Sequence, residues 1–219
     1  MKNTKLHVKG IILDLDGTLV DSRQAYLEAT RTAFSAVGQR TVSIKTAMEI
    51  PRRFEQGIPL DDLLPGVDVK NFRRIYLKSF YKAVAVMAKP LPNIADSLKK
   101  LSEKAKLALT TKREVPNKVV IEQLKKIGLE RYFQAVITAC DKFSPKPSPD
   151  ALIECSRKLG VKTNECAVVG DSIVDIEAGR RAGAKTVAVL SGIFSRDELK
   201  KQKPDLILTS VRELPDFLE

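Results

Sequence analysis

The 219-residue sequence has one histidine, three cysteines and no long apolar run. The histidine, His7, lies upstream of every motif described below, which disfavours histidine-based catalysis. The cysteines are odd in number and more than ten residues apart, a pattern that indicates neither a disulfide framework nor a zinc cluster. No stretch approaches the roughly 18 apolar residues of a membrane span, and the start lacks a signal-peptide pattern. We therefore expect a soluble, cytoplasmic protein with no membrane partner.

Charged residues are plentiful and biased toward the positive sign. Lysine and arginine number 38 against 27 acidic residues, for a net charge of +11. Such an excess suits nucleic acid or an anionic metabolite. Because the basic residues are spread along predicted helices and no recognised nucleic-acid module accompanies them, we expect a metabolite and no nucleic acid. A chain of 219 residues is long enough for one sizeable core and a smaller second unit, and its 43% hydrophobic content is ordinary for a folded soluble protein.

An apolar strand with an acidic end is the most informative stretch of the chain. Residues 11–15 read Ile-Ile-Leu-Asp-Leu, which is typical of a parallel strand buried on both faces. Asp14 and Asp16, followed by Gly17 and Thr18, stand where this strand ends. Two carboxylates are costly there unless a cation or a substrate compensates them. The sequence therefore predicts a functional site at this strand end.

Residues 20–89 are predicted to form an all-helical unit. Apolar residues recur at helical spacing after Ser22 and again in a long amphipathic helix that begins near residue 70. Three prolines are expected to break the chain between these helices: Pro51, Pro59 and Pro65. The segment Lys89-Pro-Leu-Pro-Asn93 then acts as a stiff joint that ends the unit.

Beyond residue 93 the pattern alternates between helix and strand. Apolar runs that predict strands lie at residues 107–109, 135–138, 167–169 and 186–190. Two Ser-x-x-Glu sequences, beginning at Ser195 and Ser210, are typical of helix starts. Such alternation predicts a Rossmann-like, doubly wound parallel sheet of the α/β class. We therefore predict an α/β core of residues 1–19 and 90–219 with an all-α cap domain of residues 20–89 inserted after its first strand.

Polar side chains follow the predicted strands and could converge at one edge of the sheet. Besides Asp14 and Asp16, these are Thr110, Lys146 and Asp171 with Asp175. Phosphoryl transfer requires such a set, because one carboxylate attacks phosphorus, a second exchanges a proton with the leaving oxygen, and a divalent metal screens the approach of one anion to another. Magnesium prefers oxygen ligands, and a hydroxyl and an ammonium can bind phosphoryl oxygens.

Taken in order, these residues resemble the four motifs of the haloacid dehalogenase superfamily. The resemblance extends from the first strand to the last ones, and the helical insert is similar to the family's first type of cap. It implies that Asp14 is the nucleophile and a Mg²⁺ ligand, and that Asp16 is the general acid and base and gives the metal its backbone carbonyl. Thr110 and Lys146 would bind the phosphoryl group, and Asp171 would complete the metal site.

The same resemblance implies roles for residues around this centre. Asp175 would complete the acidic motif without binding the metal directly. Thr111 stands where the family often has Asn or Ser, and its backbone amide would bind phosphate. Residues 57–60, Gly-Ile-Pro-Leu, are similar to the cap loop of phosphoglycolate phosphatases. Arg52 and Arg53 of the cap could meet an anionic substrate, although paired arginines beside a proline also suit a solvated turn.

The resemblance predicts a magnesium-dependent phosphatase of a small phosphorylated metabolite, with a phosphoglycolate-like substrate as the first guess. The presence of Asp16 disfavours dehalogenase and phosphonatase chemistry, because those members lack an acid at this position. Sugar phosphomutases keep both aspartates and are the nearest alternative, but Tyr26 replaces the histidine of their cap. A non-catalytic binding or regulatory protein of the same fold is the alternative from another class. A monomer and a homodimer are equally compatible with the sequence.

Overall fold

The computed structural model describes residues 5–39 and 41–219. They form two compact units, one made of residues 5–20 and 90–219 and the other of residues 21–39 and 41–89. Two short strands lie where the units meet in the sequence, β2 (Val20–Asp21) and β3 (Lys89–Pro90), and they pair with each other. Each unit is described by itself.

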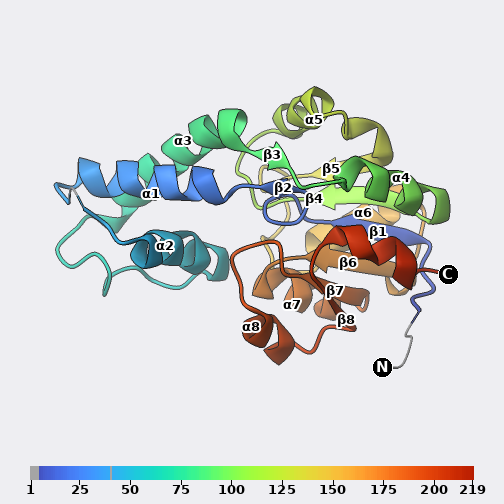
Figure 1. Ribbon diagram of the computed structural model, residues 1–219. Coiled ribbons are helices and arrows are strands. Elements are labelled where there is room, and N and C mark those ends of the chain that lie inside the picture. Colours follow the sequence, from blue (N-terminus) through green and yellow to red (C-terminus); the bar gives the residue numbers. More distant parts are fainter. Residues whose placement is uncertain (1–4, 40) are drawn as a thin grey trace. The chain divides into compact units, whose positions relative to one another are not determined.

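The larger unit is built on a six-stranded sheet in the order β5-β4-β1-β6-β7-β8, with helices on both faces (Figure 1). All its strand pairs are parallel. The strands are β1 (Gly10–Leu13), β4 (Lys106–Thr110), β5 (Phe133–Ile137), β6 (Cys166–Gly170), β7 (Lys185–Val189) and β8 (Leu206–Leu208). The predicted α/β class and doubly wound parallel sheet are confirmed.

Strand β1 is central to this sheet and fixes the position of the acidic segment. All four of its residues are buried, as its continuous apolar sequence requires of a strand covered on both faces. Leu13 at its end is in register with Leu109 of β4 on one side and Val169 of β6 on the other. The chain order reverses between these two neighbours. Open α/β sheets bind ligands at such a switch point, beyond the carboxyl ends of the strands.

Helices alternate with the strands of this unit. They are α4 (Ile94–Lys104), α5 (Asn117–Lys126), α6 (Asp150–Leu159), α7 (Ile173–Arg181) and α8 (Arg196–Lys201), with 3-10 turns η1 (Glu130–Tyr132), η2 (Thr163–Glu165) and η3 (Val211–Phe217). Ser195 forms the predicted capping box with Glu198. The one predicted at Ser210 is wrong, because Glu213 bonds to Thr209 instead and only a 3-10 turn follows.

The smaller unit consists of α1 (Arg23–Ala36), α2 (Ile44–Gln56) and α3 (Val69–Met87). Aromatic rings form its centre, with Tyr26 stacked on Phe80 at a centroid distance of 5.1 Å. The expected break at Pro51 is wrong, since this proline is buried inside α2. A proline removes only one helical hydrogen bond, and the burial of Ile50 beside it favours the continued helix.

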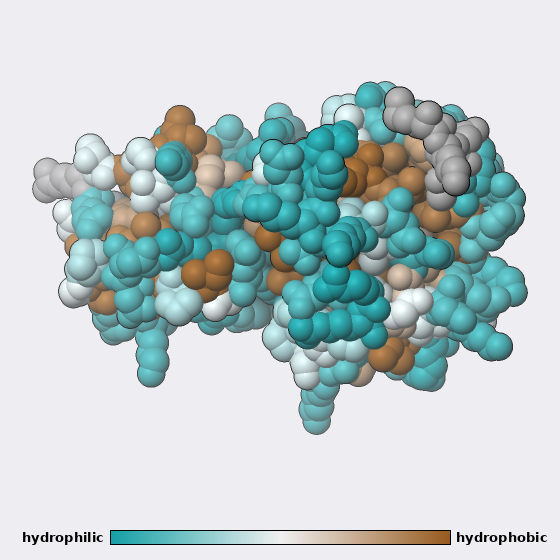
Figure 2. All heavy atoms as spheres, turned by 90° about the horizontal axis from the view of Figure 1, so that it is seen from below, coloured by the Kyte–Doolittle hydropathy of each residue, from teal (hydrophilic) through white to brown (hydrophobic). Residues whose placement is uncertain are grey.

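The surface is mainly hydrophilic on the face shown in Figure 2, where brown apolar patches are separated by teal side chains. Large apolar side chains that are exposed are Ile44, Ile58, Val86, Met87, Phe143 and Ile153. Among the described residues, no helix is both long and apolar enough to cross a membrane.

Candidate active site

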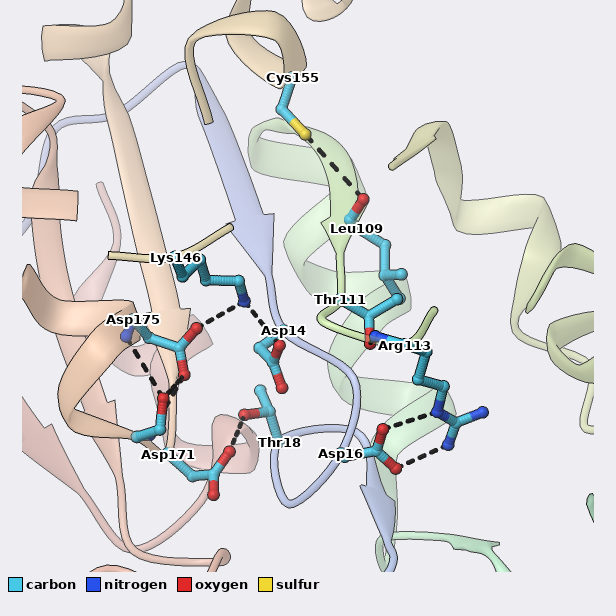
Figure 3. Close-up of polar contacts among 11 residues, drawn as sticks. Asp14, Asp16, Thr18, Leu109, Thr111, Arg113, Lys146, Cys155, Asp171 and Asp175 are labelled. Atoms are coloured by element: carbon cyan, nitrogen blue, oxygen red, sulfur yellow. Dashed lines mark hydrogen bonds and ion pairs between the residues drawn. The ribbon is translucent and has the colours of Figure 1, made fainter. Parts of the chain in front are cut away.

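Lys146 connects two buried carboxylates, one just after the central strand β1 and one in the first turn of α7. It lies in the loop before α6, and its Nζ donates to Oδ1 of Asp14 at 2.7 Å and to Oδ1 of Asp175 at 2.6 Å (Figure 3). All three side chains are buried. Burial by itself lowers the pKa of the Lys146 ammonium, but the charges of Asp14 and Asp175 outweigh this effect and hold that pKa above its usual value. The lysine is therefore a fixed positive charge.

Acidic side chains surround this lysine. Carboxylate oxygens of Asp14, Asp171 and Asp175 lie within 4.8 Å of one another. Like charges this close in a buried place repel each other, and a cation among them would relieve the repulsion. Carboxylate oxygen is the ligand that hard divalent cations prefer. The donor set thus fits a divalent metal.

Asp175 has a different environment from the other two acids. Its Oδ1 accepts from Lys146, and its Oδ2 accepts from the backbone N–H of Ser172 at 3.2 Å and from the Ser172 hydroxyl. Ser172 and Asp175 form a capping box at the start of α7, which does not match the usual Ser-x-x-Glu pattern because its acidic member is Asp instead of Glu. Both oxygens of Asp175 are therefore engaged by neighbouring side chains and the start of α7.

The loops around Asp171 approach it closely. The Thr18 hydroxyl donates to Oδ1 of Asp171 at 3.0 Å, and both side chains are buried. A Cβ atom at Gly192 would lie only 1.7 Å from Oδ2 of Asp171, so the close approach of this loop requires glycine. In the sequence, Thr18 stands next to the acidic pair but carries no sign of this contact, and Gly192 has no signal at all. Thr18 binds one oxygen of the Asp171 carboxylate, and the backbone at Gly192 packs against the other, so both restrict its position.

Asp16 lies apart from this cluster and is turned toward Arg113 (Figure 3). The guanidinium of Arg113 donates from Nε and Nη2 to the two oxygens of Asp16, each at 2.6 Å. Both side chains are buried or nearly so, with exposed fractions of 4% for Arg113 and 11% for Asp16. Arg113 was missed in the sequence, where its only signal is a basic residue in the loop that follows the strand ending at Thr110.

The three residues predicted to bind phosphate meet at one pocket. Thr110, Thr111 and Lys146 all line it, and all three are buried. The backbone N–H of Thr111, expected to bind phosphate, instead donates to the carbonyl of Ile137 at 3.0 Å and extends the pairing of β4 with β5. This amide therefore has a partner within the sheet. The Thr111 hydroxyl accepts from the backbone N–H of Arg113 at 3.3 Å.

The two arginines predicted to meet a substrate lie on α2 of the helical unit. Arg53 forms ion pairs with Asp62 and Glu49 and donates to the carbonyl of Pro59, so the structure gives it a role in holding the turn after α2. These contacts raise the pKa of Arg53, with the hydrogen bond to Asp62 as the main cause. Arg52 pairs with Glu49 at 3.3 Å.

Comparisons with known proteins point to one family. The family model described as haloacid dehalogenase-like hydrolase matches residues 11–189. A protein of Halalkalibacterium halodurans named pyrophosphatase PpaX is 28% identical over 218 residues, covering 98% of this chain and 97% of the relative. A phosphoglycolate phosphatase of Escherichia coli is 28% identical over 94% of this chain and 91% of its own. A haloacid dehalogenase-like hydrolase from Streptococcus pneumoniae has the same fold, with a TM-score of 0.79, 22% identity and coverage of 95% and 97%.

Proposed function

Because the chain belongs to the haloacid dehalogenase-like hydrolases, as its motifs indicate, we propose that it is a magnesium-dependent phosphatase of small phosphorylated metabolites. The observation that carries the proposal is the buried contact of Lys146 with Asp14 beside Asp171, at the switch point of the sheet. The names of its relatives, which include phosphatases and a pyrophosphatase, support a phosphoric ester or anhydride as substrate.

The residues that would hold the metal are Asp14, Asp171 and the backbone carbonyl of Asp16. When bound, Mg²⁺ would neutralise charge on the phosphoryl oxygens and on the carboxylates around them. Three carboxylates gathered within 4.8 Å of one another support a divalent rather than a monovalent ion. Thr18 and Gly192 fix Asp171 from two sides, which prepares the carboxylate for this task.

In the first half of the proposed reaction, a carboxylate oxygen of Asp14 attacks the phosphorus of the ester. The new bond joins Asp14 to the phosphoryl group, and the bond from phosphorus to the ester oxygen breaks. Asp16 gives the departing oxygen a proton, so an alcohol leaves instead of an alkoxide. Lys146 stabilises the ionised form of Asp14 before the attack and, with the hydroxyl of Thr110, binds the phosphoryl oxygens during transfer.

In the second half, water cleaves the aspartyl-phosphate. Asp16, now a carboxylate, takes a proton from the attacking water, and the bond between phosphorus and Asp14 breaks. Inorganic phosphate leaves, and both aspartates return to their starting protonation states. The same residue thus serves as acid and then as base, which requires its carboxylate to be held in place through both steps.

For the substrate, we propose a small phosphate ester similar to phosphoglycolate. The helical unit would act as the cap that selects it, with Arg52 as a candidate for its anionic end. Arg53 is a weaker candidate, because Asp62 and Glu49 engage its guanidinium. Tyr26, at the position of the mutase histidine, stacks on Phe80 inside the helical unit, which argues against a sugar phosphomutase. We propose a cytoplasmic location and a monomer or homodimer.

The experiment is to measure phosphate release from a panel of phosphorylated metabolites and pyrophosphate, with Mg²⁺ and with EDTA. We expect Mg²⁺-dependent release that Asp14→Asn abolishes, while Asp61→Asn, which changes an exposed carboxylate, retains activity. Wild-type turnover by Asp14→Asn would exclude the mechanism. Conversion of one sugar phosphate isomer to another would indicate a mutase, and binding of a metabolite without turnover would indicate a regulatory protein.

A further inference from the structure

The ion pair between Asp16 and Arg113 is a second buried arrangement that the reaction outlined above does not explain. We propose that Arg113 is a positioning residue, which holds the carboxylate of Asp16 in the orientation from which it exchanges a proton with the leaving oxygen and with water. This inference rests on the proposed function, because it assigns Asp16 the role of acid and base.

The geometry of the pair restrains Asp16 strongly. Its two oxygens each accept at 2.6 Å from a different nitrogen of the same guanidinium. A planar guanidinium that binds a carboxylate by two parallel bonds fixes the plane of the carboxylate as well as its distance. A lysine could make only a point contact and would leave the carboxylate free to rotate. The pair thus orients a short side chain that extends from the loop after β1.

Arg113 is itself held from several directions. Its Nη1 donates to Oε1 of Gln123 on α5, and its backbone N–H donates to the hydroxyl of Thr111. The backbone carbonyl of Arg113 accepts from the N–H of Ala139 in the loop after β5, at 3.1 Å. An exposed arginine loses side-chain entropy when it forms an ion pair. Arg113 is buried and already fixed, so its ion pair with Asp16 costs less of this entropy. It can therefore serve as a rigid support.

The ion pair is compatible with proton exchange. An ionised carboxylate offers about four lone-pair sites, two on each oxygen. The two bonds from Arg113 occupy one site on each oxygen of Asp16. These two bonds use only part of what a carboxylate can accept, so Arg113 can keep the carboxylate in plane while a proton is exchanged. The guanidinium stays charged throughout, since it does not lose its proton in proteins.

The proposal is tested through the dependence of kcat/KM on the leaving group. This parameter covers the steps up to formation of the phosphoenzyme, in which Asp16 protonates the departing oxygen. An alkyl phosphate such as phosphoglycolate needs that proton, whereas p-nitrophenyl phosphate has a good leaving group and needs it much less. A variant that merely folds less well would lose kcat/KM equally for both esters. The ratio of the two values therefore reports the action of Asp16.

We expect Arg113→Met to reduce kcat/KM for the alkyl ester about tenfold more than for p-nitrophenyl phosphate, a part of the total contribution of an acid. Arg113→Lys should give an intermediate ratio, and Gln123→Leu a smaller change in the same direction. Arg196→Met, a change of an exposed arginine on α8, should leave the ratio as in the wild type. Asp16→Asn should change the ratio most. In the double variant, Arg113→Met should cause no further change of the ratio.

An equal loss for both esters, or no loss, would overturn the inference, as would a further change of the ratio in the double variant. If Arg113→Met does not fold, Arg113→Lys and Gln123→Leu decide in the same way. The inference and the proposed function fail differently. If the wild type hydrolyses neither ester, or Asp14→Asn hydrolyses both, the proposed function is wrong. If Asp16→Asn changes the ratio and the Arg113 variants do not, only the role of Arg113 is wrong.

Discussion

The Nζ atom of Lys146 lies 2.6 Å from Oδ1 of Asp175, and both side chains are buried. The contact joins the loop before α6 to the first turn of α7. Because the other oxygen of Asp175 caps α7 through Ser172, one carboxylate positions the ammonium and begins the helix that follows Asp171. The stability of α7 and the position of the ammonium are therefore coupled at this residue.

Asp175→Asn should impair both properties. The amide keeps an oxygen for Ser172 but offers no charge to Lys146, whose buried ammonium is left with Asp14 as its main counter-charge. Breaking a buried ion pair by changing one partner costs about 3 kcal/mol. We expect the free energy of unfolding, measured with urea, to fall by about that amount, and phosphate release to fall about tenfold or more.

The matched control for Asp175→Asn is Asp61→Asn, which removes the same charge at an exposed position. Its free energy of unfolding should stay within about 0.5 kcal/mol of the wild type. If Asp175→Asn is as stable as Asp61→Asn, the coupling described above does not exist.

Gly192→Ala should weaken the metal site more than the fold. The new methyl group would lie 1.7 Å from Oδ2 of Asp171, so this carboxylate must move from the position in which Thr18 holds it. A displaced ligand binds its metal less tightly, and we expect the Mg²⁺ concentration for half-maximal activity to rise about tenfold. A Mg²⁺ titration of phosphate release gives this value.

Gly66→Ala is the control that separates displacement of the Asp171 carboxylate from backbone strain. Gly66 has a φ of +74°, and a Cβ atom added there would have no neighbouring atom within 4 Å, so alanine is strained at this position but meets nothing. The substitution should lower the free energy of unfolding by about 1 kcal/mol and leave the Mg²⁺ titration unchanged. The same Mg²⁺ shift in both glycine variants would contradict the role of Gly192.

Thr18→Val should also weaken metal binding, because it replaces the hydroxyl that donates to Asp171 by a methyl group of similar size. Loss of a hydrogen bond to a metal ligand typically lowers affinity by about tenfold or more. Thr18→Ser keeps the hydroxyl and should retain most of the affinity. Calorimetric titration with Mg²⁺ measures both variants without relying on turnover, and equal affinities would remove Thr18 from the site.

The α/β core could be predicted because its strands are buried on both faces and so appear as apolar runs, as in residues 11–13. Helix ends were predictable where local chemistry decides them, as at Ser195. The continuation of α2 through Pro51 was not, since burial of neighbouring residues such as Ile50 outweighs one lost hydrogen bond. The capping box expected at Ser210 does not form for a different reason. Glu213 accepts a hydrogen bond from the backbone N–H of Thr209 instead of that of Ser210.

In the candidate site, the side chains with reactive groups could be predicted from the sequence. The residues that position these side chains could not. Asp14, Lys146 and Asp171 follow strands or lie in loops whose order matches a known family. Arg113 and Gly192 have no such signal, because their roles depend on contacts with residues 97 and 21 positions away. Such contacts are set by the register of the sheet and the path of its loops. They became visible only in the three-dimensional structure.

The three cysteines should differ sharply in reactivity. Burial raises the pKa of the Cys155 thiol to about 12 and that of Cys166 to about 11, whereas Cys140 is exposed. A raised pKa means that the reactive thiolate is scarce below that pH, and burial also blocks access. At pH 8 we expect one thiol to react quickly with Ellman's reagent in the native protein and all three in urea. Cys140→Ser should remove the fast phase, and a second fast thiol in native protein would show that Cys155 or Cys166 is not buried as described.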